Sequence, residues 1–247
     1  MQRNRFKAQL LARKQQLGIW SMLASSNVVE VLTQSDYDWI LLDTEHAPNE
    51  VPMVLDQLRT VAQTTMSAVV RPNTNDAVVL KRLLDIGAQT VLVPMVDTAD
   101  DARRAVAAVR YPPLGIRGVS LATRANRYGR DADYGQCANE EVCLLVQLET
   151  PKALENLESI AAVDGIDGIF VGPADLAVAD LNGDGRLDVA VARLAPELSR
   201  ARVQRLLEEG AVTVDASSVA NIKDFSVNVD KMLKQDRFVL GNSGLKN

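Results

Sequence analysis

The sequence is poor in the residues that bind transition metals. Its 247 residues include one histidine, His46, and two cysteines, Cys137 and Cys143. A structural zinc site takes four Cys or His ligands, and an H-E-x-x-H metalloprotease site takes two histidines, so this inventory excludes both. Two cysteines do not make a disulfide framework in a chain of this length, and we expect a reducing compartment.

Excess positive charge and long apolar runs are also missing. The chain has 27 Lys and Arg against 32 Asp and Glu, a net charge of −5, which argues against a dedicated nucleic-acid-binding protein. Apolar runs such as Thr90–Val96 are far too short to span a bilayer. The first 18 residues carry five basic residues but not the apolar core of a secretory signal. We therefore expect a cytoplasmic protein without nucleic-acid or membrane partners.

Motifs of several other enzyme classes are absent. No G-x-S-x-G elbow surrounds a serine, so a serine hydrolase is not supported. No P-loop is present, and the stretch NGDGRLD departs from the dinucleotide-binding pattern because Asp188 stands at its third glycine. The sequence therefore supports neither a serine hydrolase nor a P-loop or dinucleotide-binding protein.

Short apolar runs alternate with stretches of helical spacing through most of the chain. Continuous apolar strands between amphipathic helices are typical of a parallel sheet that is covered on both faces. Six such units in about 175 residues, with room for two more, favour a single-domain α/β fold of the TIM (β/α)8 barrel type over residues 1–247. The predicted strands are Leu17–Met22, Trp39–Asp43, Ser67–Arg71, Thr90–Val96, Val142–Glu149 and Gly168–Gly172, and the predicted helices include Val51–Gln63, Asp76–Gly87, Ala99–Arg110 and Pro151–Val163.

A further helix is predicted before the first strand. Phe6, Leu10 and Leu11 have helical spacing among several basic residues. This pattern indicates a short basic helix that packs lightly on the body of the protein.

Reactive side chains follow four of the predicted strands. His46 comes after the second strand, Arg71 ends the third, Glu149 ends the fifth and Asp175 follows the sixth. In a parallel barrel all strand C-termini open on the same face, where active sites lie. Each residue taken alone has an ordinary alternative role as a helix cap or a loop anchor. Their recurrence at successive strand ends favours a shared site.

The residue types at this face indicate metal-assisted chemistry on an oxo acid. Glu149 and Asp175 offer hard oxygen ligands suited to Mg2+ or Mn2+. Arg71 can bind a carboxylate or a developing oxyanion, and His46 can carry a proton near neutral pH. A metal that polarises a carbonyl beside a base enolises a 2-oxo acid. The lysine nearest to a predicted strand end is Lys152, three residues beyond Glu149. A Schiff-base aldolase is therefore less favoured than a metal-dependent one.

Blocks of sequence around these residues resemble one known family. The blocks are LLDTEHAPNE, VVRPN, LLDIGAQTVLVPMV, YPPLGIRGVSLATRANRYG, LLVQLETPKALENL and GIDGIFVGPADLA, within the span from Leu17 to Ala177. They are similar to the HpcH/HpaI aldolases, class II pyruvate aldolases that act on 4-hydroxy-2-oxoheptanedioate or 2-keto-3-deoxy sugar acids. The resemblance implies a TIM barrel of the phosphoenolpyruvate/pyruvate type and reversible cleavage of a 4-hydroxy-2-oxo acid to pyruvate and an aldehyde. It also implies Mg2+ or Mn2+, with Co2+ as an alternative, and no organic cofactor.

The same resemblance implies roles for individual residues. The roles cover binding of the metal, binding of the substrate and proton transfer. By position they fall on Glu149 and Asp175 for the metal, Arg71 for pyruvate and its enolate, His46 as base, Asp85 as its carboxylate partner, Gln147 as a substrate contact, and the backbone of Gly172, Pro173 and Ala174 as the cradle of the pyruvate carboxylate.

Beyond Ala177 the family's motifs stop while the alternating pattern continues. Residues 178–247 are predicted to supply two helices and two strands, which either complete the barrel or leave it open. The predicted elements are Pro196–Glu209, Ala211–Asp215, Val229–Lys234 and Arg237–Leu240. The family's last helix packs at the interface of its trimers or hexamers, and that helix has no counterpart here, so the oligomeric state is open.

One segment of this divergent part has the spacing of a calcium loop. Asp180, Asn182, Asp184 and Asp188 stand at positions 1, 3, 5 and 9 of an EF-hand-like pattern, but its twelfth position is Val191 instead of Glu. An Asp/Asn/Gly-rich turn after the sixth strand is the simpler interpretation. The altered C-terminal part leaves open a barrel that is noncatalytic or binds Ca2+.

A separate alternative keeps the same fold and changes the chemistry, to a citrate-lyase-β-like acyl-CoA lyase or an oxaloacetate decarboxylase.

A loop between the fourth and fifth strands is rich in arginine. Arg117, Arg124, Arg127 and Arg130 lie within 14 residues of one another. Long loops of barrels shape access to the substrate, so these arginines are candidates for attracting an acidic aldehyde. An equally supported interpretation is that they pair with a neighbouring subunit.

Overall fold

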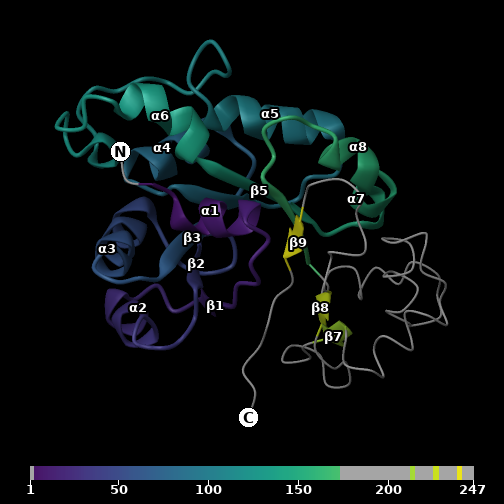
Figure 1. The fold of residues 1–247 in the computed structure, drawn as a ribbon, viewed down its shortest axis with the longest axis horizontal. Coiled ribbons are helices and arrows are strands. Elements are labelled where there is room, and N and C mark those ends of the chain that lie inside the picture. The colour runs from purple at the N-terminus through teal and green to yellow at the C-terminus, as the bar shows by residue number, and fades with distance from the viewer. Residues whose placement is uncertain (1–2, 173–211, 215–224, 228–237, 241–247) are drawn as a thin grey trace.

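The computed structural model describes residues 3–172, 212–214, 225–227 and 238–240. Seven of the described strands form one parallel sheet in the order β1-β2-β3-β4-β5-β6-β9, with helices arranged in an arc around it (Figure 1). The fold is therefore α/β with a curved, barrel-like parallel sheet. Its strands are β1 (Gly18–Ser21), β2 (Trp39–Asp43), β3 (Ser67–Arg71), β4 (Thr90–Val93), β5 (Cys143–Leu148), β6 (Gly168–Val171) and β9 (Phe238–Leu240).

The helices begin and end where the sequence supplies caps. The side chains of Asp76 and Thr98 cap α4 and α5, and the predicted helix over 151–163 is divided into two short helices at Asn156. The helices are α1 (Arg5–Leu11), α2 (Ser26–Leu32), α3 (Val51–Val61), α4 (Ala77–Asp85), α5 (Ala99–Val109), the 3-10 turn η1 (Arg124–Asn126), α6 (Tyr134–Glu141), α7 (Pro151–Glu155) and α8 (Leu157–Ala161).

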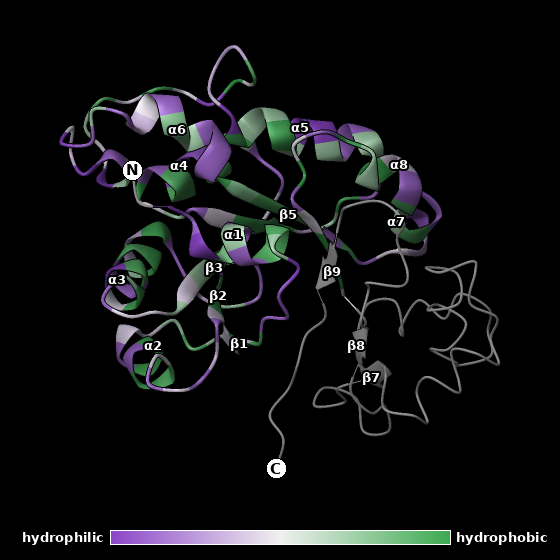
Figure 2. Cartoon of the chain, in the orientation of Figure 1, coloured by the Kyte–Doolittle hydropathy of each residue, from purple (hydrophilic) through white to green (hydrophobic). Residues whose placement is uncertain are grey.

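Both faces of the sheet are buried, as the continuous apolar runs predict. On the outer face Ile40 and Leu42 of β2 pack in the cluster that also contains Leu80 and Leu84 of α4. Neighbouring residues of β2, Trp39 and Leu41, point into the barrel interior, where they meet the side chains of β3, β4, β5 and β6. The covering helices carry both hydrophobic and hydrophilic residues (Figure 2), so their apolar sides complete the outer layer.

Helix α1 inserts its apolar residues into the interior of the barrel. Phe6 and Leu10 are 0% and 3% exposed, and both belong to the inner cluster. The Phe6 ring meets the Trp39 ring edge-on, with centroids 6.0 Å apart. The expectation of light packing is therefore wrong for these two residues, whereas Leu11 is 65% exposed. The helix supplies apolar side chains to the N-terminal end of the inner core, which short strands do not fill alone.

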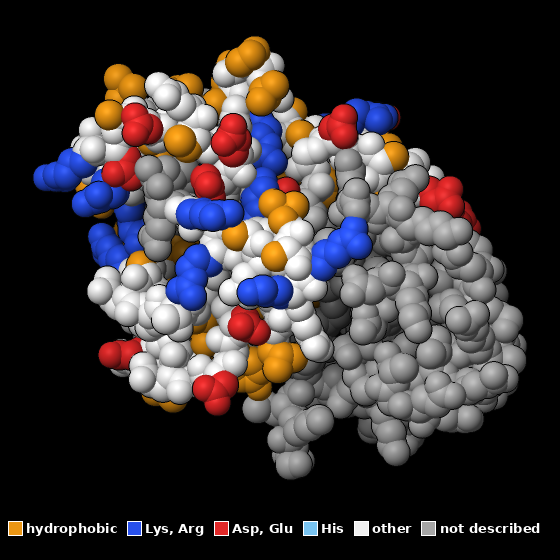
Figure 3. All heavy atoms as spheres, in the orientation of Figure 1, with side chains coloured by type: hydrophobic (Ala, Val, Ile, Leu, Met, Phe, Trp, Pro, Cys, Tyr) orange, Lys and Arg blue, Asp and Glu red, His pale blue; other side chains and the backbone are white. Residues whose placement is uncertain are grey.

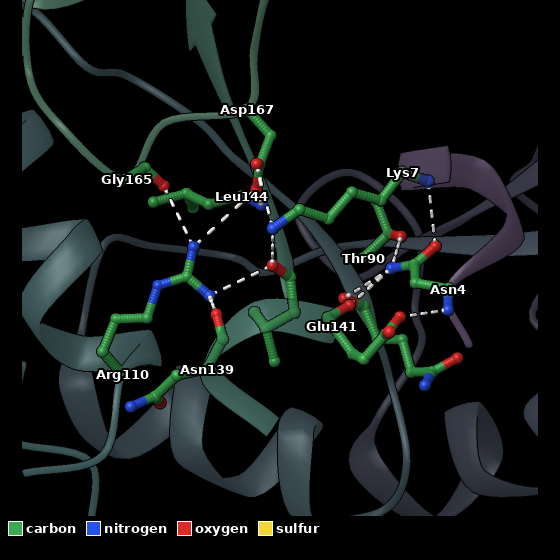
Figure 4. A network of polar contacts seen from close by, with 11 residues as sticks. Asn4, Lys7, Thr90, Arg110, Asn139, Glu141, Leu144, Gly165 and Asp167 are labelled. Atoms are coloured by element: carbon green, nitrogen blue, oxygen red, sulfur yellow. Dashed lines mark hydrogen bonds and ion pairs between the residues drawn. The ribbon is translucent and has the colours of Figure 1, made fainter. Parts of the chain in front are cut away.

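Polar contacts hold α1 in this position (Figure 4). Asn4 accepts a hydrogen bond from the Lys7 backbone N–H and donates through Nδ2 to Thr90 Oγ1 and to the Glu141 carbonyl, each at 3.0 Å. The Lys7 ammonium forms an ion pair of 3.0 Å with Asp167. These contacts join α1 to the segments that lead into β4, β5 and β6, so the helix covers part of the N-terminal end of the curved sheet.

The last strands differ from the prediction for a closed barrel. The strand expected over 211–215 is present as β7 (Val212–Val214), but it pairs antiparallel with β8 (Phe225–Val227) in a separate sheet. Ten residues separate β7 from β8, which is too short for the crossover that parallel pairing requires. The strand expected over 237–240 is present as β9, directly beside β6. Within the described residues no pairing joins β9 to β1, and the helices expected over 196–209 and 229–234 lie outside them.

None of the helices in the described part of the chain combines the length and the apolarity that crossing a membrane requires.

Candidate active site

The candidate site lies at the C-terminal ends of the strands, inside the barrel. Asp43 and Arg71 are register partners at the ends of β2 and β3, and both follow the inward-pointing series of their strands. Gln147 continues the inward series of Cys143 and Leu145 along β5, and Glu149 comes two residues later. Side chains alternate between faces with a period of two, so these polar residues form the layer directly above the apolar interior.

Arg71 is fixed in this layer by two carboxylates. Its Nε and Nη2 donate to Oδ1 and Oδ2 of Asp43, each at 2.8 Å, and its Nη1 lies 2.9 Å from Glu45 Oε2. The guanidinium carbon also lies 4.5 Å from the centre of the Trp20 ring. Arg71 is 4% exposed and Asp43 is fully buried. The result is a planar cation held in one orientation at the end of the barrel.

The loop that carries His46 is tied to the ends of two strands. Thr44 Oγ1 donates to the last carbonyl of β3 at 2.7 Å, and Asn49 Nδ2 donates to the last carbonyl of β2 at 2.7 Å. Gln57 of α3 in turn donates to Asn49 at 2.6 Å. The His46 imidazole is 63% exposed, with Nε2 3.8 Å from Glu45 Oε2. A rigid loop thus presents a solvent-accessible imidazole beside a carboxylate that contacts Arg71.

Glu149 is a buried carboxylate held by two donors. Its Oε2 accepts a hydrogen bond of 2.9 Å from the backbone N–H of Met95, and its Oε1 accepts one of 2.7 Å from Gln147 Nε2. Gly172 lies against this pair, since a Cβ at that position would stand 3.0 Å from Glu149 Cγ and 3.1 Å from Gln147 Nε2. The absence of a side chain at Gly172 therefore leaves room beside the carboxylate.

The donor set on β5 suits a divalent cation. Gln147 Oε1 is buried and has no hydrogen-bond partner within the described residues, and it belongs to the same amide that bonds Glu149. A carboxylate and an amide oxygen are ligands of the type that Mg2+ and Mn2+ take. Among the described residues no cluster of three His, Cys, Asp or Glu side chains forms a metal set. Several predicted site residues lie outside the described part of the chain. They are Pro173, Ala174 and Asp175, and the loop residues Asp180, Asn182, Asp184 and Asp188.

Asp85 is not brought to His46 within the chain. It ends α4, at the end of the helix that leads into the start of β4, whereas His46 follows the end of β2. Its carboxylate pairs with Arg117 Nη2 at 2.9 Å, and Arg117 also donates to Tyr134 Oη at 3.2 Å. The implied partnership of Asp85 with His46 therefore remains a prediction.

The model of the HpcH/HpaI aldolase/citrate lyase family matches residues 16–196 of the sequence. The chain belongs to this family. The match extends beyond Ala177, the last residue of the motifs that carry the resemblance. Membership makes the protein an HpcH/HpaI-type aldolase, an enzyme of the lyase class.

Individual members of the HpcH/HpaI family are similar over most of the chain. A hydroxypyruvate/pyruvate aldolase of Sagittula stellata is 57% identical over 175 residues, which are 71% of this chain and 69% of the relative. A 4-hydroxy-2-oxo-heptane-1,7-dioate aldolase of Salmonella paratyphi A is 54% identical over 176 residues, 71% and 67% of the two chains. The crystal structure of a family protein from Burkholderia cenocepacia J2315 is 31% identical, with a TM-score of 0.76 over 97% of this chain and 93% of that one.

The sequence alone does not reveal the residues that orient Arg71 and Glu149. Arg71 contacts Asp43, Glu45 and Trp20, and Glu149 accepts from the backbone of Met95. The alternation along β2 does predict that Asp43 points inward. Trp39 and Leu41 face the interior, and Asp43 is the next residue in that series. The register that pairs it with Arg71 comes only from the structure. Met95 acts through its backbone N–H, which no side-chain pattern reveals.

Proposed function

We propose that this aldolase depends on a divalent metal and reversibly cleaves a 4-hydroxy-2-oxo acid into pyruvate and an aldehyde. The observation that carries the proposal is the orientation of Arg71, whose guanidinium is held by Asp43 and Glu45 at the open end of the barrel. The names of relatives at more than 50% identity, pyruvate aldolase and 4-hydroxy-2-oxo-heptane-1,7-dioate aldolase, support the same substrate class.

Arg71 stabilises negative charge on the three-carbon product. A buried guanidinium that is already oriented needs no rearrangement when charge develops on the 2-oxo oxygen. This fixed orientation is what electrostatic preorganisation means. Its two carboxylate neighbours hold it in position. Lysine would carry the charge without the fork that defines this geometry.

Glu149 and Asp175 would hold the cation, and Gln147, which donates to Glu149, would contact the substrate. When bound, Mg2+ or Mn2+ supplies Lewis acidity toward the 2-oxo group. Glu149 is kept in place by the Met95 N–H and by Gln147, so its oxygens are oriented before the cation arrives. The backbone of Gly172, Pro173 and Ala174 is assigned to the pyruvate carboxylate, and of these residues Gly172 lies against Glu149.

His46 moves the proton of the 4-hydroxyl group. As base it takes this proton, the C3–C4 bond breaks, and the bonding electron pair passes to the enolate of pyruvate while the aldehyde leaves. Protonation of the enolate at C3 then gives pyruvate. The exposure of the imidazole at 63% allows the proton to exchange with water between turnovers.

The test requires no knowledge of the aldehyde. The protein is incubated with pyruvate and Mg2+ in D2O, and the loss of the methyl proton signal is followed by NMR. We expect exchange that stops with a chelator and falls sharply in Arg71→Ala and Glu149→Gln. Absence of exchange with Mg2+, Mn2+ and Co2+ would overturn the proposal. Cleavage of a CoA ester or decarboxylation of oxaloacetate without pyruvate exchange would instead support the alternative chemistry.

A further inference from the structure

A cavity opens at the N-terminal ends of the strands, opposite the end that carries the candidate active site. It has a volume of about 880 Å3 and reaches Ser67 and Thr90, the first residues of β3 and β4. Arg71, by contrast, is the last residue of β3. A cavity of this size accommodates a small organic ligand.

The wall of this cavity is strongly basic. Five arginines line it, and Asp131 is the one carboxylate that lines it among the described residues. Figure 3 shows Lys and Arg side chains gathered between the places of α3 and α6, beside the N-terminus. The arginines are Arg3, Arg5, Arg124, Arg127 and Arg130. A chain of net charge −5 that concentrates arginine in this way creates a local positive potential against its overall charge.

The arginine-rich loop predicted from the sequence is thereby divided between two environments. Arg117 is buried, pairs with Asp85 and lies over the Tyr111 ring, so it has a structural role. Arg124, Arg127 and Arg130 instead face the cavity. Because the cavity lies at the N-terminal ends of the strands, these three arginines are not positioned to guide an aldehyde to Arg71 of the same chain.

Local contacts orient these three arginines, two of them through backbone carbonyls and one through Asp131. Arg124 donates to the backbone carbonyls of Ile86 and Leu58 at 2.8 and 3.4 Å, and burial, with nearby Arg59, lowers its pKa. Arg130 donates to a backbone carbonyl at 3.4 Å, and Arg127 lies 3.4 Å from Asp131. Neutral carbonyls fix a guanidinium without cancelling its charge, which leaves the cavity suited to an anion.

Apolar and aromatic residues form another part of the wall. Leu58, Val61 and Met66 contribute from α3 and the segment before β3, and Tyr128 and Tyr134 contribute from the far side. Tyr128 is 57% exposed, so its ring is accessible to a ligand. A ligand that matches both parts has phosphate groups at the arginines and a flat or apolar body against the tyrosines.

We propose that this cavity binds a small organic phosphate with two or more phosphate groups, of the size of a nucleoside diphosphate. Arg5 and Arg130 contact the phosphates by charge-assisted hydrogen bonds, and Tyr128 packs against the organic body. The site is separate from the aldolase site and does not depend on the identity of the aldolase substrate.

The proposal is tested by titration calorimetry with ADP and with inorganic pyrophosphate, at low ionic strength and with EDTA to remove metals. We expect one ADP site per chain and tighter binding of ADP than of pyrophosphate. The variant Arg5→Gln/Arg130→Gln should weaken both ligands by about tenfold or more, since two charge-assisted contacts are lost. Tyr128→Ala should weaken ADP and leave pyrophosphate unchanged.

The matched control removes the same charge from another surface. Arg103 and Arg104 of α5 are exposed and pair with Asp100 and Asp101, away from the cavity. Arg103→Gln/Arg104→Gln should leave the affinities for ADP and pyrophosphate within about twofold of the wild-type values. Exposed ion pairs away from the cavity affect binding there only through the net charge. Equal weakening in the two double variants, no saturable binding of either probe, or ADP affinity no greater than that of pyrophosphate would overturn the proposal.

Discussion

Arg71 and Asp43 form a two-pronged ion pair between adjacent strands, with Nε–Oδ1 and Nη2–Oδ2 distances of 2.8 Å each. The two residues are register partners at the ends of β3 and β2, so the sheet itself sets their separation. The third guanidinium nitrogen contacts Glu45 in the following loop. The strand register thereby determines the plane of the arginine that the proposed reaction uses.

Removing the charge of Asp43 should destabilise the fold. In Asp43→Asn the buried Arg71 loses one of its two carboxylates, and breaking a buried pair in this way costs about 3 kcal/mol. Urea unfolding followed by circular dichroism measures the change. The control is Asp56→Asn, whose pair with Arg59 is exposed at 61% and 54%, and which should cost less than about 1 kcal/mol. Equal costs for the two variants would contradict the structural role of Asp43.

Glu149→Gln should remove metal binding while the fold is kept. The amide keeps the shape of the side chain but loses the charge that a divalent cation requires, and we expect the affinity for Mn2+ to fall by at least about 100-fold. Electron paramagnetic resonance of free Mn2+ measures the affinity. Glu158→Gln on α8 is the control, since that exposed carboxylate lies outside the site. Undiminished Mn2+ affinity in Glu149→Gln would refute its role as a ligand.

A methyl group at Gly172 should disturb the same ligand. The new Cβ would stand 3.0 Å from Glu149 Cγ and 3.1 Å from Gln147 Nε2, so both side chains must shift. Displacement of an oriented ligand lowers metal affinity by about tenfold. The comparison is Gly135→Ala, where a Cβ meets nothing within 4 Å. Equal Mn2+ affinities for Gly172→Ala and Gly135→Ala would show that the close approach of Gly172 to Glu149 does not affect metal binding.

Truncation of Phe6 should reveal how strongly α1 stabilises the barrel. Phe6 is fully buried in the inner cluster, and Phe→Ala at such a site costs about 3–5 kcal/mol. Leu11→Ala on the same helix removes a side chain that is 65% exposed and should cost less than about 0.5 kcal/mol. Unfolding free energies from urea titrations test the difference, which disappears if α1 packs only lightly.

Stability should fall at high pH through the buried thiol of Cys143. Burial raises the pKa of this thiol well above its usual 9.0, so in alkali the unfolded state loses a proton that the folded state retains. The contribution is fully present below pH 9.0 and is lost as the pH rises above it, at about 1.4 kcal/mol per pH unit. Unfolding free energies of wild type and Cys143→Ala, measured as the pH is raised, should diverge by this slope. Cys137→Ala is the control and should follow the wild type.

The sequence predicts local structure and strand ends better than it predicts partners. The apolar runs that form β2, β3 and β5 are buried on both faces, a condition that periodicity captures directly. Arg71 and Glu149 are candidate site residues from the sequence because strand C-termini share one end of a parallel sheet.

What escaped prediction depends on register and on distant contacts. The pair that Asp85 forms with Arg117, 32 positions away, is one such contact, and the implied role of Asp85 beside His46 stays a prediction. The antiparallel pairing of β7 with β8 depends on the length of their connection and not on the pattern of either strand. Four clustered arginines were treated as one group, although one is buried and three line a cavity.

The position of α1 has a consequence for the order of folding. The helix precedes every strand that it contacts, and Asn4 bonds Glu141 across 137 positions of the chain while Lys7 reaches Asp167. During synthesis α1 therefore leaves the ribosome long before its binding surface exists. The contacts of Asn4 and Lys7 with the segments before β5 and β6 form only after those segments have been made. The docking of α1 is a late event in folding, and a protein bound to α1 in this interval would hold the barrel open at its N-terminal end.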